Sequence, residues 1–141
     1  MITRIDHVAI LLPELADGTS FWVDALGLPL EKIEEIPEQQ VKIALLSVGD
    51  SHIELLEPTD DASGVAGYLQ KRGPGLHHIC LEVDDIEETI VRLKEANVPL
   101  IDKEPKTGKD GKRLVFIHPK GTGGVLVELY QFPNLNQDVK S

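Results

Sequence analysis

The spacing of hydrophobic residues along the chain changes between strand-like and helical in an order that occurs twice. In the first half, strand-forming residues at 5–12 end at Pro13, because proline cannot donate to a strand ladder. Helical spacing follows over 15–26 and ends at Gly27, the residue type that terminates helices in a left-handed conformation. Three further strands are expected at 30–36, 41–48 and 51–56. The first half therefore predicts a strand, a helix and three strands.

The same order follows in the second half. A short helix at 63–72 is expected to link the halves and to end in the turn residues Gly73-Pro74-Gly75. A strand at 79–83 precedes a helix at 86–96, whose first turn carries the acidic residues favoured at helix N-termini. The remaining strands are expected near 100–101, 113–118 and 124–130. The 141 residues thus predict a single domain made of a module at about 4–60, a linking helix at about 62–73, a module at about 75–131 and a C-terminal tail at 132–141.

A histidine and a glutamate occur at matching places in the two copies. His7 lies on the opening strand of the first copy, and His78 lies on the opening strand of the second, 71 positions later. Glu54 and Glu128 lie on the two closing strands, 74 positions apart. The second separation is slightly longer than the first, which a short insertion in the loops of the second copy explains. The sequence therefore predicts one supersecondary unit used twice, with one histidine and one glutamate in each copy.

Side chains alternate between the two faces of a strand, so the face of each of these residues can be predicted. His7 is expected opposite the apolar face that packs under a helix, and it shares its side with the small Ala9. The same parity applies to His78, Glu54 and Glu128. Burying such polar groups without a partner costs several kcal/mol, so the four are expected to bind a divalent cation. Two imidazoles and two carboxylates suit zinc, cobalt, nickel, manganese or iron equally.

The other histidines fit this pattern less well. His77 has the opposite parity and its repeat partner is Asp6, so we expect it to support the site from outside the ligand set or to be structural. His52 and His118 have inward parity but no histidine at the matching place of the other copy. They are reserve ligands only.

Composition and charge narrow the classes of function. Hydrophobic residues make up 41% and charged residues 27%, which is typical of a globular domain. The net charge of −10 repels a phosphate backbone, so nucleic acid is excluded as an expected partner. Neither an apolar run long enough to span a membrane nor a signal peptide is visible, so we expect no membrane association and a cytoplasmic location. Cys80 is the only cysteine, which excludes an intramolecular disulfide.

Basic residues nevertheless cluster in one glycine-rich stretch of the second half. They are Lys103, Lys106, Lys109, Lys112, Arg113 and Lys120. Such a run is either a solvated loop or a local docking site for an anionic ligand on an otherwise acidic protein.

The chain has one histidine on each opening strand and one glutamate on each closing strand. This pattern resembles that of the vicinal oxygen chelate (glyoxalase/bleomycin resistance/dioxygenase) superfamily. Several motifs are also similar to those of the methylmalonyl-CoA epimerase family. They are Pro37-Glu38-Gln39, Glu54-Leu55-Leu56-Glu57-Pro58, Gly75-Leu76-His77-His78-Ile79, Val83-Asp84-Asp85-Ile86, Glu104-Pro105-Lys106 and Phe116-Ile117-His118-Pro119-Lys120. The similarity runs from residue 5 to about residue 130, nearly the whole chain.

This resemblance implies an α+β fold of two tandem βαβββ modules, whose mixed sheet curls around a central metal site, in a homodimer. It implies His7, Glu54, His78 and Glu128 as ligands, most often of Co2+, with Mn2+, Zn2+, Ni2+ or Mg2+ as alternatives. The implied activity is that of an isomerase of propionate metabolism, which interconverts (2R)- and (2S)-methylmalonyl-CoA. A proton leaves the alpha carbon and returns to it through a metal-stabilised enolate. Ethylmalonyl-CoA, one methylene longer, is an alternative substrate.

Epimerisation requires a base on each face of the reacting carbon. In part of the family one base is the equivalent of Glu128 and the other is a glutamate on the third strand, where this chain has Ile43. We therefore expect Glu54 and Glu128 to be the two catalytic bases. Because coenzyme A carries phosphates, which favour basic partners, the expected substrate-binding residues are Lys106, Lys112, Arg113, His118 and Lys120.

Three other functions are compatible with parts of the pattern. A glyoxalase I-like lactoylglutathione lyase shares the four ligands and the proton abstraction, but the motifs at 75–79 and 116–120 argue against it. An extradiol dioxygenase uses two histidines and one carboxylate with open positions for oxygen, so a fourth ligand argues against it. A metal-free small-molecule-binding module of the same fold would not need the four ligands together, and the metal content of the purified protein would identify it.

Overall fold

A computed structural model describes residues 1–108 and 110–133 of the chain. The chain divides into two compact units. The first, called here the N-terminal unit, is His7–His78, and the second, the C-terminal unit, comprises Met1–Asp6 and Ile79–Ser141. Strands β1 (Ile2–Leu11) and β5 (Gly75–Val83) each contribute residues to both units. The boundaries of the two modules inferred from the sequence remain a prediction.

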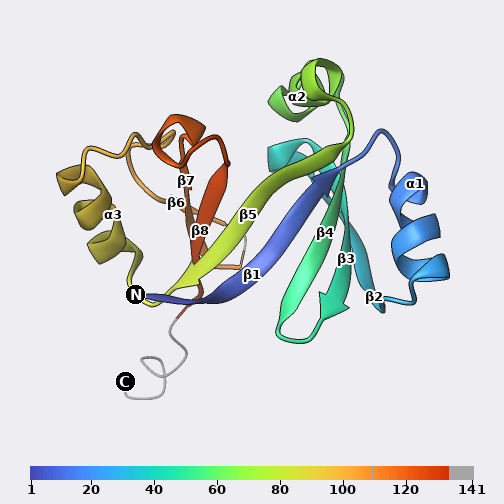
Figure 1. The fold of residues 1–141 in the computed structure, drawn as a ribbon, viewed down its shortest axis with the longest axis horizontal. Coiled ribbons are helices and arrows are strands. Elements are labelled where there is room, and N and C mark those ends of the chain that lie inside the picture. Colours follow the sequence, from blue (N-terminus) through green and yellow to red (C-terminus); the bar gives the residue numbers. More distant parts are fainter. Residues whose placement is uncertain (109, 134–141) are drawn as a thin grey trace. The chain divides into compact units, whose positions relative to one another are not determined.

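The N-terminal unit contains a mixed sheet with the strand order β2-β3-β4-β1 (Figure 1). Its other strands are β2 (Leu30–Ile36), β3 (Val41–Val48) and β4 (Ser51–Pro58). β3 pairs antiparallel with both β2 and β4, whereas β1 runs parallel to β4. A 3-10 turn, η2 (Pro37–Gln39), connects β2 to β3. β1 is parallel to its partner because helix α1 intervenes and lets the chain cross back over the sheet.

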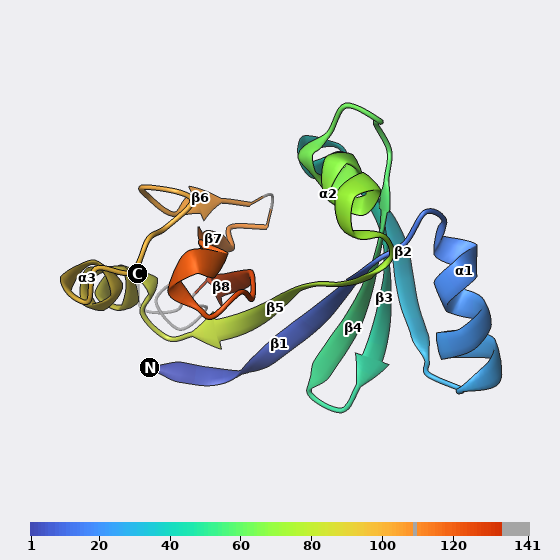
Figure 2. The same cartoon turned by 45° about the horizontal axis from the view of Figure 1, so that its top comes forward.

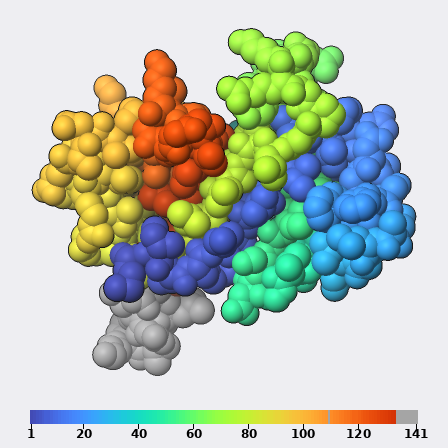
Figure 3. All heavy atoms as spheres, viewed as in Figure 1, coloured from blue at the N-terminus to red at the C-terminus, as the bar shows by residue number. Residues whose placement is uncertain are grey.

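Two helices cover opposite faces of these strands (Figures 1 and 2). Helix α1 (Leu15–Thr19) continues into a π-helical segment, η1 (Ser20–Ala25), and packs on one face against a cluster that includes Leu46 and Leu55. Helix α2 (Gly64–Arg72) packs on the other face, against a cluster that includes Leu11 and Leu56. It lies at the surface of its unit (Figure 3). The face opposite α1, on which α2 packs, is the face that carries His7.

The C-terminal unit repeats the arrangement, with the strand order β5-β8-β7-β6. Its strands after β5 are β6 (Lys106–Thr107), β7 (Arg113–Ile117) and β8 (Val127–Gln131). β5 runs parallel to β8, and the other pairs are antiparallel. Helix α3 (Ile86–Glu95) packs on a core that includes Val83, Val115 and Leu129, and a 3-10 turn, η3 (Pro119–Gly121), follows β7. The predicted α+β class and the twofold strand-helix-three-strand order are thus confirmed.

Each unit holds the start of its helix with a side chain from its closing strand. In the N-terminal unit the backbone N–H of Leu15 donates to Glu57 Oε1 at 2.9 Å. In the C-terminal unit the N–H of Ile86 donates to Gln131 Oε1 at 2.7 Å. The first N–H groups of a helix have no partner within it, so these contacts satisfy groups that would otherwise be unbonded. Glu57 and Gln131 follow Glu54 and Glu128 by three residues each, so the duplication extends to the way each helix is anchored.

The strands of the C-terminal unit differ from the sequence predictions at three places. Residues 100–101 do not form a strand, because Leu100 makes only an isolated bridge with Ile117 and the Asp102 carboxylate then takes the N–H of Phe116 at 3.2 Å. The short strand β6 at Lys106–Thr107 was not expected. The last strand begins at Val127 rather than 124, because the backbone before it turns at Gly123 and Gly124, which have φ of 81° and 104°. None of the helices in the described part of the chain has the length and apolar character that crossing a bilayer requires.

Candidate metal centre

His7 is placed by the alternation of side chains along β1. Ile10 belongs to the cluster under α1, whereas Ala9 and Leu11 belong to the cluster on the opposite face. His7 shares parity with Ala9 and Leu11, and its side chain is only 2% exposed. The predicted face of His7 agrees with this placement.

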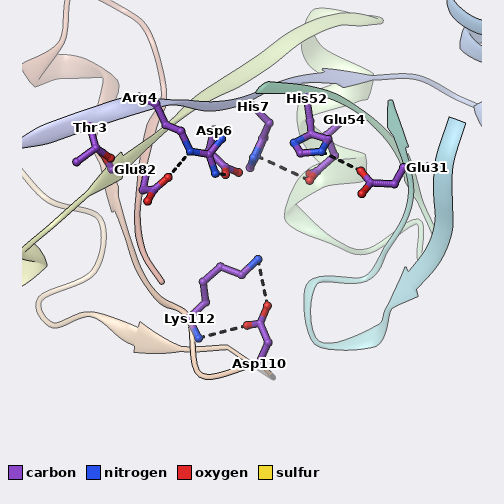
Figure 4. A network of polar contacts seen from close by, with 10 residues as sticks. All are labelled: Thr3, Arg4, Asp6, His7, Glu31, His52, Glu54, Glu82, Asp110 and Lys112. Atoms are coloured by element: carbon purple, nitrogen blue, oxygen red, sulfur yellow. Dashed lines mark hydrogen bonds and ion pairs between the residues drawn. The ribbon is translucent and has the colours of Figure 1, made fainter. Parts of the chain in front are cut away.

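Glu54 reaches the same face from the neighbouring strand. In the parallel pairing of β1 with β4, His7 is opposite His52 and Ala9 is opposite Glu54. His7 and Glu54 are therefore diagonal neighbours across the two strands. The small side chain of Ala9 leaves space on that face, and Glu54 Oε2 lies 3.8 Å from His7 Nε2 (Figure 4). The carboxylate is 15% exposed, so it is shielded but not sealed from solvent.

His78, near the middle of β5, provides a third donor atom within the N-terminal unit. Its Nε2 atom lies 3.2 Å from Nε2 of His7, and the two rings meet edge to face. His78 is 7% exposed. One ligand atom from each of His7, Glu54 and His78 lies within 4.8 Å of the other two.

This arrangement fits a divalent cation. Two ligands that each lie ~2.1 Å from one metal ion are separated by about 3.0–3.4 Å in octahedral or tetrahedral geometry. The separation of the two Nε2 atoms, 3.2 Å, falls in that range. The set of two imidazoles and a carboxylate, with the two rings almost wholly buried, suits a first-row transition metal.

His77 contacts the outer side of His78. The two Nδ1 atoms are 2.8 Å apart, and the ring of Tyr68, from α2, meets the His77 ring edge to face with centroids 4.7 Å apart. The sequence predicted that His77 lies outside the ligand set, and His77 is not a member of the three-residue cluster. Tyr68 was missed, because a tyrosine on a short linking helix carries no pattern that distinguishes it from a packing residue.

His52 contacts a glutamate outside the three donor residues. Its Nε2 atom lies 2.8 Å from Glu31 Oε2, and Figure 4 shows the two side chains pointing toward one another beside Glu54. His118, the other reserve ligand, lies in the C-terminal unit, where its Nδ1 atom accepts the N–H of Lys120 at the start of η3. Neither residue belongs to the three-residue cluster of the N-terminal unit.

Glu128 occupies, in the C-terminal unit, the position that Glu54 occupies in the N-terminal one. It pairs with Cys80 between β8 and β5, just as Glu54 pairs with Ala9 between β4 and β1. Glu128 is 2% exposed and so is more deeply buried than its counterpart. The role of Glu128 as the fourth ligand remains a prediction.

Ile43 lies in the apolar cluster that α2 covers and is 4% exposed. It pairs with Leu56 on β4 and with Glu34 on β2. The third strand of this unit therefore presents a hydrocarbon side chain at residue 43, and this side chain cannot act as a base.

The basic residues expected to bind the substrate lie in the C-terminal unit, and three of them contact acidic side chains. Lys106 pairs with Asp102 at 3.1 Å, Lys112 with Asp110 at 3.3 Å, and Arg113 with Glu87. Lys112 also lies over two aromatic rings, 4.7 Å from the centroid of Tyr130 and 5.2 Å from that of Phe132. Lys120 takes part through its backbone in the turn at His118, and Lys109 lies outside the described residues.

Lys112 also changes the acidity of its partner. Partial burial disfavours the charged form of Asp110, but the Lys112 ammonium and hydrogen bonds from Lys112 outweigh that effect. The pKa of Asp110 therefore lies below its usual value.

Comparison with known proteins supports the repeat-based interpretation. Residues 6–116 match the model of the glyoxalase/bleomycin resistance protein/dioxygenase superfamily. The chain is 40% identical over 129 residues to the mitochondrial methylmalonyl-CoA epimerase of Mus musculus, a match that covers 91% of this chain and 72% of the mouse protein. It is 40% identical over 133 residues to the ethylmalonyl-CoA/methylmalonyl-CoA epimerase of Cereibacter sphaeroides, covering 93% and 99% of the two chains.

A solved structure gives the same result. A variant of the methylmalonyl-CoA epimerase of Streptomyces coelicolor, in complex with 2-nitronate-propionyl-CoA, matches with a TM-score of 0.84 and 34% identity. The match covers 95% of this chain and all of that one. The chain therefore belongs to the glyoxalase/bleomycin resistance protein/dioxygenase superfamily and, within it, to the family of the methylmalonyl-CoA epimerases.

Proposed function

We propose that the protein is a metal-dependent isomerase that interconverts (2R)- and (2S)-methylmalonyl-CoA by removing and returning the proton of the alpha carbon. The observation that carries this proposal is the meeting of His7 Nε2, His78 Nε2 and a Glu54 oxygen on one strand face of a chain from this family. The relatives named above are epimerases of this substrate, and one was solved with a coenzyme A ligand.

Four side chains would hold the cation. His7, Glu54 and His78 supply three ligands, and Glu128 is proposed as the fourth because it repeats the register and exceeds the burial of Glu54. When bound, a divalent cation supplies Lewis-acid stabilisation of the negative charge that develops on the thioester oxygen. Co2+ is the first candidate, with Mn2+, Zn2+, Ni2+ and Mg2+ as alternatives to be compared.

Two carboxylates would move the proton. Ile43 cannot accept a proton, so the bases are assigned to Glu54 and Glu128, which stand at equivalent positions of the two copies. Each would serve one face of the planar enolate, one removing the proton and the other supplying it. The same carboxylates thus bind the metal and act as acid and base.

The family indicates the acyl group of the substrate, and the basic residues indicate where its coenzyme A portion binds. Lys106, Lys112, Arg113, His118 and Lys120 are proposed to bind the coenzyme A portion, whose phosphates would compete with the present acidic partners. Ethylmalonyl-CoA is a second candidate substrate, because one additional methylene changes binding in an apolar site by only about 1–3 kcal/mol. We further propose a cytoplasmic homodimer.

Deuterium incorporation from heavy water into methylmalonyl-CoA tests the proposal. The metal-free protein, prepared with a chelator, is expected to show little exchange, and added Co2+ is expected to restore it. The other four cations are compared in the same assay to identify the one that supports the fastest exchange. Absence of exchange with every cation would overturn the epimerase assignment, and formation of lactoylglutathione from its hemithioacetal would replace it with the glyoxalase one.

A further inference from the structure

We propose that His77 is a positioning residue, whose ring accepts a hydrogen bond from Nδ1–H of His78 and thereby directs the lone pair of His78 Nε2 toward the cation. This inference rests on the metal site of the proposed function and assigns a role to a side chain that is not one of the ligands. It depends on contacts within the N-terminal unit alone.

The geometry places the two nitrogens of His78 in different surroundings. Its Nε2 atom faces Nε2 of His7 at 3.2 Å, on the side where the ligand atoms meet. Its Nδ1 atom lies 2.8 Å from Nδ1 of His77, a normal hydrogen-bond distance. One ring nitrogen of His78 therefore faces the proposed cation site, and the other contacts His77.

Counting protons fixes the direction of this hydrogen bond. A neutral imidazole carries one N–H, and a nitrogen that coordinates a metal ion must present its lone pair. If Nε2 of His78 binds the cation, the proton is on Nδ1 and is donated to Nδ1 of His77. His77 then carries its own proton on Nε2. Residues that accept such a bond from a ligand histidine fix both its tautomer and its ring orientation.

A second contact holds the His77 ring in place. Tyr68, on α2, meets it edge to face at 4.7 Å, and Tyr68 also packs against the apolar cluster of Leu11, Ile43 and Leu56. Helix α2 itself starts at a fixed point, because Ser63 Oγ accepts the N–H of Ala66 at 3.1 Å. The acceptor for His78 is therefore held by packed structure instead of by a flexible side chain.

Two substitutions separate the hydrogen bond from the packing. His77→Phe keeps an aromatic ring against Tyr68 but removes the acceptor. His77→Asn removes the ring but keeps an oxygen at the place of Nδ1. Co2+ affinity, measured by competition with a chelating dye, is expected to fall about 10- to 100-fold in His77→Phe and to stay within a few-fold of the original in His77→Asn.

The matched control is His52→Asn, which removes a histidine that pairs in register with His7 but bonds to Glu31. It is expected to leave Co2+ affinity unchanged. The visible absorption spectrum of the Co2+-loaded protein provides a second readout, because a reoriented His78 changes the ligand field: we expect a shifted spectrum in His77→Phe only. If His77→Phe does not fold, His77→Gln, whose acceptor lies one bond farther out, takes its place with the same expected loss.

The outcomes distinguish this inference from the function on which it rests. Equal Co2+ affinity in the original protein and His77→Phe, or equal loss in His77→Phe and His77→Asn, would overturn the positioning role while leaving the metal site intact. A protein in which neither the original chain nor any variant binds a divalent cation would overturn both. Thermal unfolding of each metal-free variant shows whether a loss of affinity comes from a damaged fold.

Discussion

Glu54 and Glu128 are equivalent in register but differ in exposure, at 15% and 2%. If each serves one face of the alpha carbon, Glu54→Gln and Glu128→Gln should each impair proton removal from one enantiomer preferentially. A lost general base typically costs about 10²–10⁴-fold in rate. The measurement is deuterium exchange into pure (2R)- and (2S)-methylmalonyl-CoA at saturating Co2+. Glu31→Gln, which changes a half-exposed glutamate outside the three-residue cluster, is the control. Equal losses with both enantiomers in both variants would contradict separate roles.

The contact between Lys112 and Asp110 allows a prediction about pH. Because the pKa of Asp110 is lowered in the folded protein, the contact contributes stability above the unfolded pKa of this carboxyl, and the contribution is lost as the pH falls through the folded pKa. In Lys112→Met the pKa of Asp110 is expected to rise, as measured by NMR titration of its carboxyl carbon. Asp102 is the reference signal, since its partner Lys106 is unchanged. A pKa of Asp110 that does not move would show that Lys112 is not the main cause.

If Lys112 also binds coenzyme A phosphates, the same variant has a second phenotype. A contact made equally in the ground state and the transition state affects KM and leaves kcat nearly unchanged. We therefore expect Lys112→Met to raise KM for methylmalonyl-CoA. A change in kcat alone, with KM unchanged, would argue against a docking role.

At the scale of elements, helix α1 shows how packing overrides intrinsic helix propensity. A Cβ at Gly18 would lie 2.4 Å from Leu12 Cδ1 and 2.8 Å from Leu55 Cδ1, so the helix packs closely against these two leucine side chains at this residue. Overpacking of this kind costs about 1–3 kcal/mol, which exceeds the ~0.5–1 kcal/mol that alanine gains over glycine in a helix. Gly18→Ala is therefore expected to lower the free energy of unfolding by about 1 kcal/mol or more, measured by urea denaturation.

Gly67 is the matched control for this prediction. It lies within α2, and a Cβ there would meet no atom within 4 Å. Gly67→Ala should accordingly raise the free energy of unfolding by about 0.5–1 kcal/mol. If both substitutions change stability in the same direction, close packing around α1 is not the reason that alanine is unfavourable at residue 18.

The elements also show which features of the fold the sequence predicts. The strands at 30–36 and 41–48 and the starts of α1 and α3 were predicted correctly, because hydrophobic spacing and the helix cap at Asp85 act over a few neighbouring residues. Residues 100–101 were not, because the neighbouring Asp102 side chain takes the N–H of Phe116, a residue far along the chain, and so decides how far that ladder extends. Patterns over a few residues predict local structure. Side-chain hydrogen bonds that end a strand depend on residues brought together by the fold, which these patterns do not predict.

The candidate site follows the same division. Parity and repetition predicted the face of His7 and its meeting with Glu54 and His78, because both arguments concern strands and need no side-chain geometry. The contact of His77 with His78 and Tyr68 was not predictable, since ring orientation depends on the helix packed beside it. The contact of His52 with Glu31 was missed because it joins side chains of β4 and β2, which are not neighbours in the sheet.

At the scale of the whole molecule, the proposed cation would be a source of folding stability. The buried His7 and His78 rings approach one another at Nε2, so binding a divalent cation to them favours the folded over the unfolded chain. At a free Co2+ concentration of 100 times Kd, ligand binding adds ~2.7 kcal/mol, which for a chain of this size corresponds to a rise in Tm of roughly 5–10 °C. A chelator should reverse the rise, and calorimetry with and without Co2+ measures it. His7→Ala removes a proposed ligand within the three-residue cluster and should abolish the rise, whereas Glu31→Gln should leave it intact. Glu128→Gln is the decisive variant, because a full rise in its presence would exclude Glu128 from the ligand set while leaving His7, Glu54 and His78 in place.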